Sequence, residues 1–217
     1  GSGNNKYGGG LIVVNFASSS SAYPDIRQTR FVYNDAIHGG GVAILDSLCA
    51  AKLTRCVLAN NDVTELGGAI LNNGFCRVNN CLLVANSAQS AGGAVYSAGA
   101  TFELVGSTIV QNVSNRVGGL YFTHGTIDAT NNVIWGNTDR FGNNDQIYLP
   151  GGNWVGNYNC IQNLDKGFGG SNSINVHPRF VDELGDDNVP ATGDENFRLL
   201  QQSPCIDVGT ADIDGDG

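Results

Sequence analysis

The chain has 217 residues, 31 glycines, no methionine, 14% charged residues and a formal charge of −9. This length is enough for one domain with a sizeable core, and the composition excludes a disordered or a mainly helical protein. Residues 1–181 carry ten acidic and ten basic side chains, whereas residues 182–217 carry ten acidic side chains and only Arg198 as a base. Because the repeat body has no basic stripe, we expect no nucleic-acid partner.

A pair of glycines followed by an apolar segment recurs along the chain. The copies lie at 9–13, 40–44, 67–71, 92–96 and 118–122. After a longer first interval the glycine pairs keep a period of about 26 residues, and a weaker sixth copy lies at 145–149. Recurrence at a nearly fixed period indicates a repeat protein, and the apolar residues after each pair predict a strand.

An apolar segment that ends in asparagine recurs in step with the glycine pairs. These asparagines are Asn34, Asn61, Asn86, Asn112, Asn137 and Asn163. Two independent markers that share one period argue against chance. Asparagine tolerates left-handed turns, and stacked amides can bond to one another. We therefore predict a hydrogen-bonded asparagine ladder, with turn asparagines facing solvent as the alternative.

A period of roughly 26 residues with two or three short strands is typical of one coil of a β-solenoid, and the leucine consensus of leucine-rich repeats is missing. The sequence predicts an all-β, right-handed parallel β-helix of about six coils over residues 1–181. Residues 182–217 are predicted to form a separate acidic extension, an irregular C-terminal cap. The position three before each asparagine is apolar and is predicted to face inward: Phe31, Leu58, Leu83, Ile109, Ile134 and Cys160.

These glycine-pair strands and the segment CLLVANSA at 81–88 resemble the repeats of secreted bacterial β-helix proteins, including the polymorphic outer-membrane proteins. The segments 175–182, 196–200 and 203–209 are similar to the C-terminal end of large exported right-handed β-helix proteins. The resemblance covers nearly the whole chain. It implies the fold and export, and it implies no particular activity.

Six cysteines without a C-x-x-C pair indicate disulfides or buried thiols in an oxidising compartment, so we expect a secreted, extracellular or cell-surface location. No apolar run approaches the length of a membrane span. Sequence leaves the connectivity open; a bridge between Cys160 and Cys205 would hold the tail over the open coil end. The candidate pairs are Cys49 with Cys76, Cys56 with Cys81, and Cys160 with Cys205.

The closing residues match the first half of a calcium loop, with carboxylates at alternate positions and a glycine turn between them. The carboxylates are Asp212, Asp214 and Asp216. Calcium is therefore the one candidate cofactor, and an acidic linker is the alternative interpretation of this segment.

Acidic residues in the repeat body are scattered, as expected for solvated surface groups. Glu103 and Asp128 are the loose exception, because their separation is close to one period and one coil would stack them. The three histidines, His38, His124 and His177, share no motif, and no nucleophile pattern occurs. We therefore expect no catalytic residues.

The leading hypothesis is a non-enzymatic extracellular structural or adhesion module that self-assembles end to end, as a homo-oligomer, filament or surface layer, through its coil ends. The alternative is a β-helix that binds or degrades cell-surface polysaccharide, with aromatic stacking platforms at Tyr96, Tyr121, Phe122 and Tyr148. Core filling explains these aromatics more simply. The insertion at 18–25 is the expected contact loop.

Overall fold

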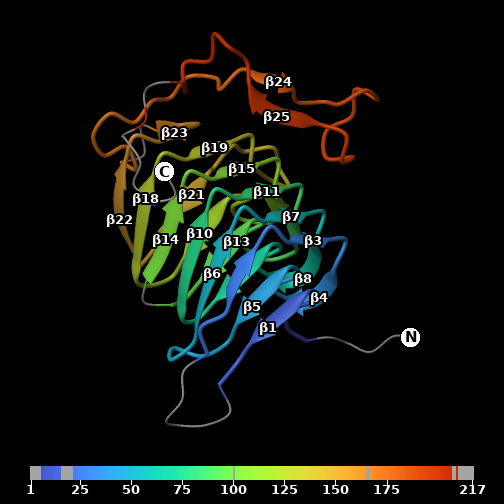
Figure 1. The fold of residues 1–217 in the computed structure, drawn as a ribbon, viewed down its shortest axis with the longest axis vertical. Helices are drawn as coiled ribbons and strands as arrows, with labels where there is room; N and C mark the ends of the chain where they lie inside the picture. The colour runs from blue at the N-terminus through green and yellow to red at the C-terminus, as the bar shows by residue number, and fades with distance from the viewer. Residues whose placement is uncertain (1–5, 16–21, 100, 165–166, 207–208, 210–217) are drawn as a thin grey trace.

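The protein is an all-β parallel solenoid of about five turns (Figure 1). The computed structural model describes residues 6–15, 22–99, 101–164, 167–206 and 209. A complete coil contributes four short strands, where the sequence predicted two or three. The strands of successive coils pair in parallel and form four sheets, which we number in the order that the chain visits them.

The first sheet contains the strands that follow the glycine pairs: β1 (Leu11–Val13), β5 (Val42–Ile44), β9 (Ile70–Asn72), β13 (Val95–Ser97), β17 (Leu120–Phe122) and β21 (Ile147–Tyr148). The second sheet has the longest strands: β2 (Asp25–Arg27), β6 (Ala50–Thr54), β10 (Phe75–Asn79), β14 (Thr101–Val105), β18 (Thr126–Thr130) and β22 (Asn153–Asn157).

The third sheet contains the strands that precede the asparagines: β3 (Arg30–Val32), β7 (Val57–Ala59), β11 (Leu82–Val84), β15 (Thr108–Val110), β19 (Val133–Trp135) and β23 (Cys160–Ile161). The fourth sheet has five strands: β4 (Asp35–His38), β8 (Asp62–Leu66), β12 (Ser87–Ala88), β16 (Val113–Ser114) and β20 (Thr138–Asp139).

The core is a set of apolar columns, because side chains at equivalent positions of successive coils stack in register. In the third sheet one such column is buried throughout, and it contains Phe31, Leu58, Leu83, Ile109 and Ile134. Its sixth member is Ile161, which pairs with Ile134, whereas the sequence predicted Cys160. The prediction was displaced by one residue because both positions are apolar, and a slip of one changes the face that a side chain occupies.

Five of the asparagines form a continuous ladder at the turn between the third and fourth sheets, and all but Asn34 are fully buried. The Nδ2 of each donates to the Oδ1 of the next, at 2.8 Å for Asn34 to Asn61, 2.8 Å for Asn61 to Asn86, 2.9 Å for Asn86 to Asn112 and 2.8 Å for Asn112 to Asn137. The backbone N–H of each donates to the same oxygen. Each amide therefore satisfies polar groups of two coils at once.

Asn163 does not continue this ladder. Asn137 Nδ2 instead donates to Gln146 Oε1 at 2.7 Å. In the register of β19 with β23, Asn163 is equivalent to Gly136, and Leu164 takes the place of the next amide. Asn163 has a φ of 58° and donates to the carbonyl of Asn144. Asn163 is thus a turn residue with left-handed backbone, which asparagine tolerates better than most residues do.

A second polar ladder lies at the turn between the second and third sheets. The backbone N–H of each member donates to the side chain of the next one, at 2.9 to 3.3 Å. Its members are Cys56, Cys81, Ser107, Asn132, Asn159 and Ser173. This ladder leaves little trace in the sequence, because thiol, hydroxyl and amide side chains share only the ability to accept a hydrogen bond.

The glycine pairs are explained by a close approach between coils. Gly67 has a φ of 68°, which few other residues adopt, and a Cβ on Gly68 would collide with the carbonyl oxygen of Gly93 in the next coil. The pairs therefore permit a tight corner between the fourth sheet and the first.

The segment 167–176 covers the end of the last coil. Phe168 packs against the main core, and Ile174 donates its N–H to the carbonyl of Asn159 at 2.8 Å. Ile174 also accepts a hydrogen bond from the N–H of Ile161. This coil end is therefore closed by residues that precede the acidic tail.

The acidic extension begins as a two-stranded antiparallel hairpin, β24 (Phe180–Asp182) with β25 (Asn196–Leu199), on the outer face of the third sheet (Figure 1). The ring of Phe180 lies edge-on to that of Phe197, at 5.3 Å between centroids, and both pack against outward side chains of the sheet such as Val110. The domain division expected at residue 181 falls inside β24.

Removal of a central amide from the asparagine ladder should destabilise the whole solenoid. Asn86 is fully buried and bonds to both neighbouring amides, so we expect Asn86→Ala to lower the free energy of unfolding by about 3 kcal/mol. Urea denaturation measures this change. Asn163→Gly is the control, because it keeps the left-handed turn and should cost less than about 1 kcal/mol. Equal effects of the two variants would contradict a stabilising role of the ladder.

Candidate functional site

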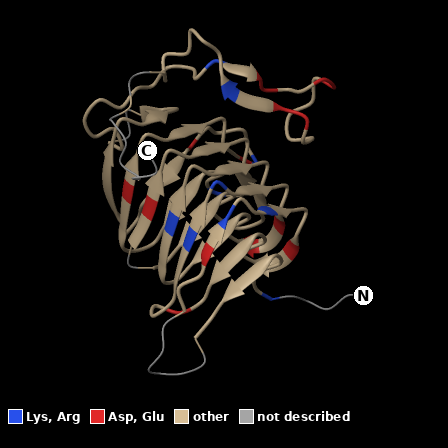
Figure 2. Ribbon diagram, in the orientation of Figure 1, with Lys and Arg blue, Asp and Glu red and all other residues tan. Residues whose placement is uncertain are grey.

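The outer face of the second sheet carries a column of charged side chains, one from each of five successive coils. Strand register places Asp25, Lys52, Arg77, Glu103 and Asp128 side by side, and Figure 2 shows them as a diagonal row of red and blue bands. The loose pair Glu103 and Asp128 noted in the sequence is thus in register. Successive members are one coil period apart in the chain, which is the sequence signal that could have revealed the entire column.

The charges of this column pair unevenly. Arg77 Nε lies 3.3 Å from a carboxylate oxygen of Glu103, and Asp25 pairs at 2.9 Å with Arg27 of its own strand. The hydrogen bond from Arg27 lowers the pKa of Asp25. Among the described residues, Lys52 has no carboxylate within 4.0 Å. Lys52 is thus a cation without a direct ion pair; it acts on its register neighbour Asp25 only through space, where its charge also lowers the pKa of that carboxylate.

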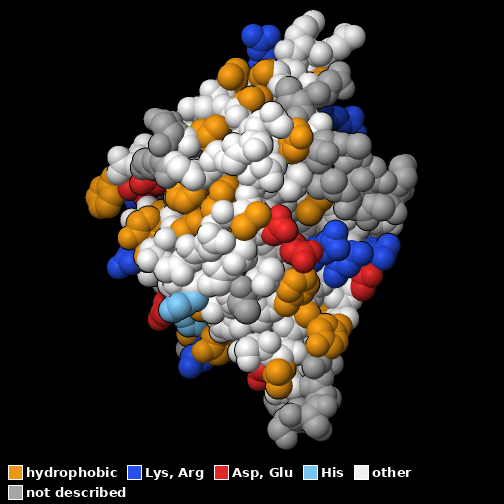
Figure 3. Space-filling model, turned by 90° about the vertical axis from the view of Figure 1, so that its left-hand side faces the viewer, with side chains coloured by type: hydrophobic (Ala, Val, Ile, Leu, Met, Phe, Trp, Pro, Cys, Tyr) orange, Lys and Arg blue, Asp and Glu red, His pale blue; other side chains and the backbone are white. Residues whose placement is uncertain are grey.

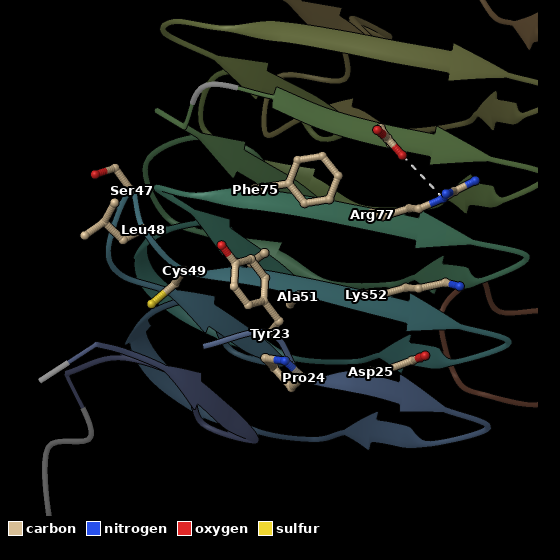
Figure 4. Close-up of a pocket in the computed structure, with 12 residues that line it drawn as sticks. Tyr23, Pro24, Asp25, Ser47, Leu48, Cys49, Ala51, Lys52, Phe75 and Arg77 are labelled. Carbon is tan, nitrogen blue, oxygen red and sulfur yellow. Dashed lines mark ion pairs between the residues drawn. The ribbon is translucent and has the colours of Figure 1, made fainter. Parts of the chain in front are cut away.

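A groove of about 640 Å³ lies over the N-terminal half of the same face. One side of the groove is apolar and is formed by Tyr23, Leu48 and Phe75, while the other carries the charged column from Asp25 to Glu103 (Figure 4). Tyr23 is 69% exposed and Leu48 is 50% exposed. Figure 3 shows hydrophobic side chains next to the red and blue groups on this face.

Local structure explains how the groove residues are presented. Side chains alternate along β10, so Phe75 and Arg77 point outward while Cys76 and Val78 are fully buried. Leu48 lies in the turn before β6, where its N–H donates to the carboxylate of Asp46 at 2.8 Å. The sequence did not single out Phe75, because aromatic residues do not recur at its position in the other coils. Tyr23, Pro24 and Asp25 belong to the insertion 18–25, which was the expected contact loop, and all three line the groove; residues 18–21 of that loop lie outside the described residues.

The four aromatic residues expected as stacking platforms have other roles. Tyr96, Tyr121 and Tyr148 stand in register on the first sheet, with ring centroids 5.5 and 5.2 Å apart, so their rings pack on one another. Phe122 points inward, is 1% exposed and lies edge-on to Phe102. Phe122 therefore fills the core, as the simpler of the two sequence interpretations expected, because it follows the outward Tyr121 on an alternating strand.

The histidines do not converge on the groove or on one another. His124 contacts the hydroxyl of Thr123, and His177 lies 3.0 Å from a carboxylate oxygen of Glu183. No three His, Cys, Asp or Glu side chains are grouped for a metal ion in the part of the chain that the structure describes. The calcium candidates Asp212, Asp214 and Asp216 lie outside the described residues.

His38 lies under the N-terminal segment of the first coil. The ring of Tyr7 stacks on it at 5.1 Å, its Nδ1 is buried without a hydrogen-bond partner among the described residues, and its Nε2 is 3.5 Å from Glu65. Burial lowers the pKa of His38, Lys6 lowers it further, and Glu65 opposes the change. The neutral imidazole is therefore favoured in the folded state.

All six cysteines are thiols in the structure. Cys56 and Cys81 are neighbours on the second ladder, where the hydrogen bond between their side chains lowers the pKa of Cys56 and raises that of Cys81. Cys76 is opposite Ala51 and Phe102 in the strand register, and burial raises its pKa. The register therefore does not place Cys49 opposite Cys76.

Cys160 and Cys205 are brought together, although they are far apart in the sequence. A hydrogen bond between the two side chains raises the pKa of Cys160 and lowers that of Cys205. Both line a small cavity of about 60 Å³ beside the last coils. The tail thus returns to the side of the solenoid at this position.

The fold and the groove define a parallel β-solenoid protein with a combined aromatic and charged site on one lateral sheet. Comparison with protein-family models, with curated proteins and with solved structures finds no match. The structure confirms the parallel β-solenoid that the resemblance to secreted bacterial repeat proteins implied, and no match confirms the resemblance itself. The described residues include no helix of the length and apolarity needed to cross a membrane.

Acid should destabilise the first coil through His38. Its pKa is below the unfolded value of 6.5, so the unfolded state binds more protons between these two values, and stability falls as the pH drops through that window. Urea denaturation from about pH 8 to about pH 5 should show this loss in the wild type. His38→Gln should have a flatter profile. If both proteins showed the same pH dependence, His38 would not be the source of the stability loss in acid.

Proposed function

We propose that this protein is an exported adhesion module that binds polysaccharide in the groove of the second sheet. The observation that carries the proposal is the exposed Tyr23 and the half-buried Phe75, which line one groove beside a register-aligned column of charged side chains. Apolar ring faces with a few placed polar groups are typical of ligand sites. A sugar offers the matching surfaces, since its ring has apolar C–H faces and its hydroxyl groups lie at the edge.

The parallel sheet gives this groove a rigid floor. Neighbouring coils are about 4.8 Å apart, so an extended chain crossing the sheet meets a new strand at each step. Side chains that project from the strands of a packed scaffold are held more rigidly in position than side chains on loops. Tyr23 and Phe75 come from different coils and would contact different parts of one bound chain.

Binding without cleavage is the function that the groove residues support best. Two carboxylates line the groove, and both are engaged: Asp25 pairs with Arg27, and Glu103 lies beside Arg77. No histidine lines the groove, and Asp128 is outside its lining. Glycoside hydrolysis usually requires two carboxyl groups that flank the scissile bond in different protonation states. We therefore favour adhesion over polysaccharide degradation.

We also propose that the module acts through its lateral face rather than by end-to-end assembly. The segment 167–176 pairs with β23 and packs on the last coil, so it occupies backbone groups that another solenoid would need at this end. An open sheet edge is the feature that invites pairing with another chain.

Loss of the groove aromatics should weaken glycan binding. We expect Tyr23→Ala and Phe75→Ala each to raise the Kd for a bound polysaccharide about tenfold, because each removes apolar contact with a sugar face. A glycan array with neutral and acidic polysaccharides identifies the ligand, and isothermal titration calorimetry measures the Kd.

Phe141→Ala is the matched control, since Phe141 is 85% exposed and lies outside the groove. Its Kd should equal that of the wild type. A blank array with the folded wild-type protein, or equal losses in all three variants, would refute glycan binding in this groove.

Export to an oxidising compartment should convert Cys160 and Cys205 to a disulfide. Exchange with oxidised glutathione would close a loop of about 45 residues and stabilise the folded protein by about 4 kcal/mol. Peptide mapping by mass spectrometry without reductant should show this bridge in the wild type and in Cys49→Ser. Complete alkylation of both cysteines after the same treatment would contradict the proposal.

A further inference from the structure

The sequence of charges along the column of the second sheet is not the one that would stabilise the sheet most. Opposite charges on neighbouring strands stabilise a sheet and like charges destabilise it, so an alternating order would be the most stable one. The column instead has two adjacent cations, Lys52 and Arg77, followed by two adjacent anions, Glu103 and Asp128. The cation pair lies within the groove, whereas the anion pair is only partly in it.

The two cations face the same space. They are direct register partners on β6 and β10, and in Figure 4 their side chains extend side by side in the same direction. The Nε of Arg77 faces Glu103, so the two terminal nitrogens of the guanidinium group are available to a ligand. Lys52 has no ion-pair partner within 4.0 Å in the described part of the chain.

A carboxylate bound between these groups would relieve their repulsion and accept charge-assisted hydrogen bonds from both. Asp25 precedes the pair in the column and Glu103 follows it, so the positive stretch is only two coils wide. This width fits one carboxylate better than the continuous phosphate backbone of a nucleic acid, which requires many cations.

The aromatic residues of the groove offer a surface for the apolar part of such a ligand. Phe75 is two residues before Arg77 on β10, a separation of about 6.6 Å along the strand. A sugar ring that packs on Phe75 therefore has an exocyclic carboxylate within reach of Arg77 and Lys52. Tyr23 offers a second apolar surface in the same groove.

We infer that the ligand of the groove is an acidic polysaccharide of uronic acid units, with the carboxylate of one unit bound between Lys52 and Arg77 and its ring packed on Phe75. This inference rests on the proposed glycan-binding function and names the class of glycan.

The test compares polygalacturonate with the same polymer after chemical reduction of its carboxyl groups, and adds alginate as a second uronic acid polymer. Isothermal titration calorimetry should show binding to at least one acidic polymer and a Kd at least about tenfold higher for the reduced polymer. Binding should also weaken as salt is raised, because the contact is between partly exposed charges.

Lys52→Ala should raise the Kd for the acidic polymer about tenfold, and Lys52→Arg should retain most of the affinity. Arg140→Ala is the control for total charge, because Arg140 is exposed and outside the groove. Lys52 points outward from the sheet, so an unchanged thermal unfolding curve should accompany each variant.

The outcomes separate the inference from the function on which it rests. Equal affinity for neutral and acidic polymers, with loss in Phe75→Ala, would keep glycan binding and overturn the acidic class. Unchanged affinity in Lys52→Ala would also overturn it, as would failure of both uronic acid polymers when a neutral glycan binds. Absence of binding to every glycan would overturn both statements.

Discussion

Each coil stacks on the next in an unchanged register, and this constraint fixes both the core and the outer faces of the sheets. Two buried ladders maintain it, one of asparagine amides and one of mixed acceptors that runs from Cys56 to Ser173. Buried amides cost free energy unless they are bonded, so a coil that shifts by one residue would lose both its apolar contacts and these bonds. The ladders therefore make the register specific, while the apolar columns supply most of the stabilisation.

The same constraint produces the surface of the second sheet. Because side chains alternate along a strand, the residues that fix the core at Cys76 and Val78 also determine that Phe75 and Arg77 point outward. A side chain at one position of every coil then becomes a straight column. The protein uses this geometry in two ways: the tyrosines of the first sheet pack on one another, whereas the charged column of the second sheet borders an open groove.

The regions outside the repeat close surfaces that the repeat leaves exposed. The segment 167–176 covers the last coil, and the hairpin of β24 and β25 covers outward apolar side chains of the third sheet, including Val84 and Val110. Gln111 ties this hairpin to the solenoid by donating to the carbonyl of Glu183 and accepting from the N–H of Ala191. The second sheet remains open over the groove, which is why a ligand site there is physically reasonable.

The coil period, the parallel β-solenoid, and the strands next to the glycine pairs and asparagines could all be predicted from the sequence, because each of them leaves a mark once per coil. The sequence also contained the charged column at the same period. The folded coils were needed to show that Asn163 is a turn residue, that Ile161 replaces Cys160 in the core, and that Tyr23 and Phe75 share a groove with Lys52. The reason is that inward and outward faces depend on a register of one residue, which adjacent apolar residues leave ambiguous.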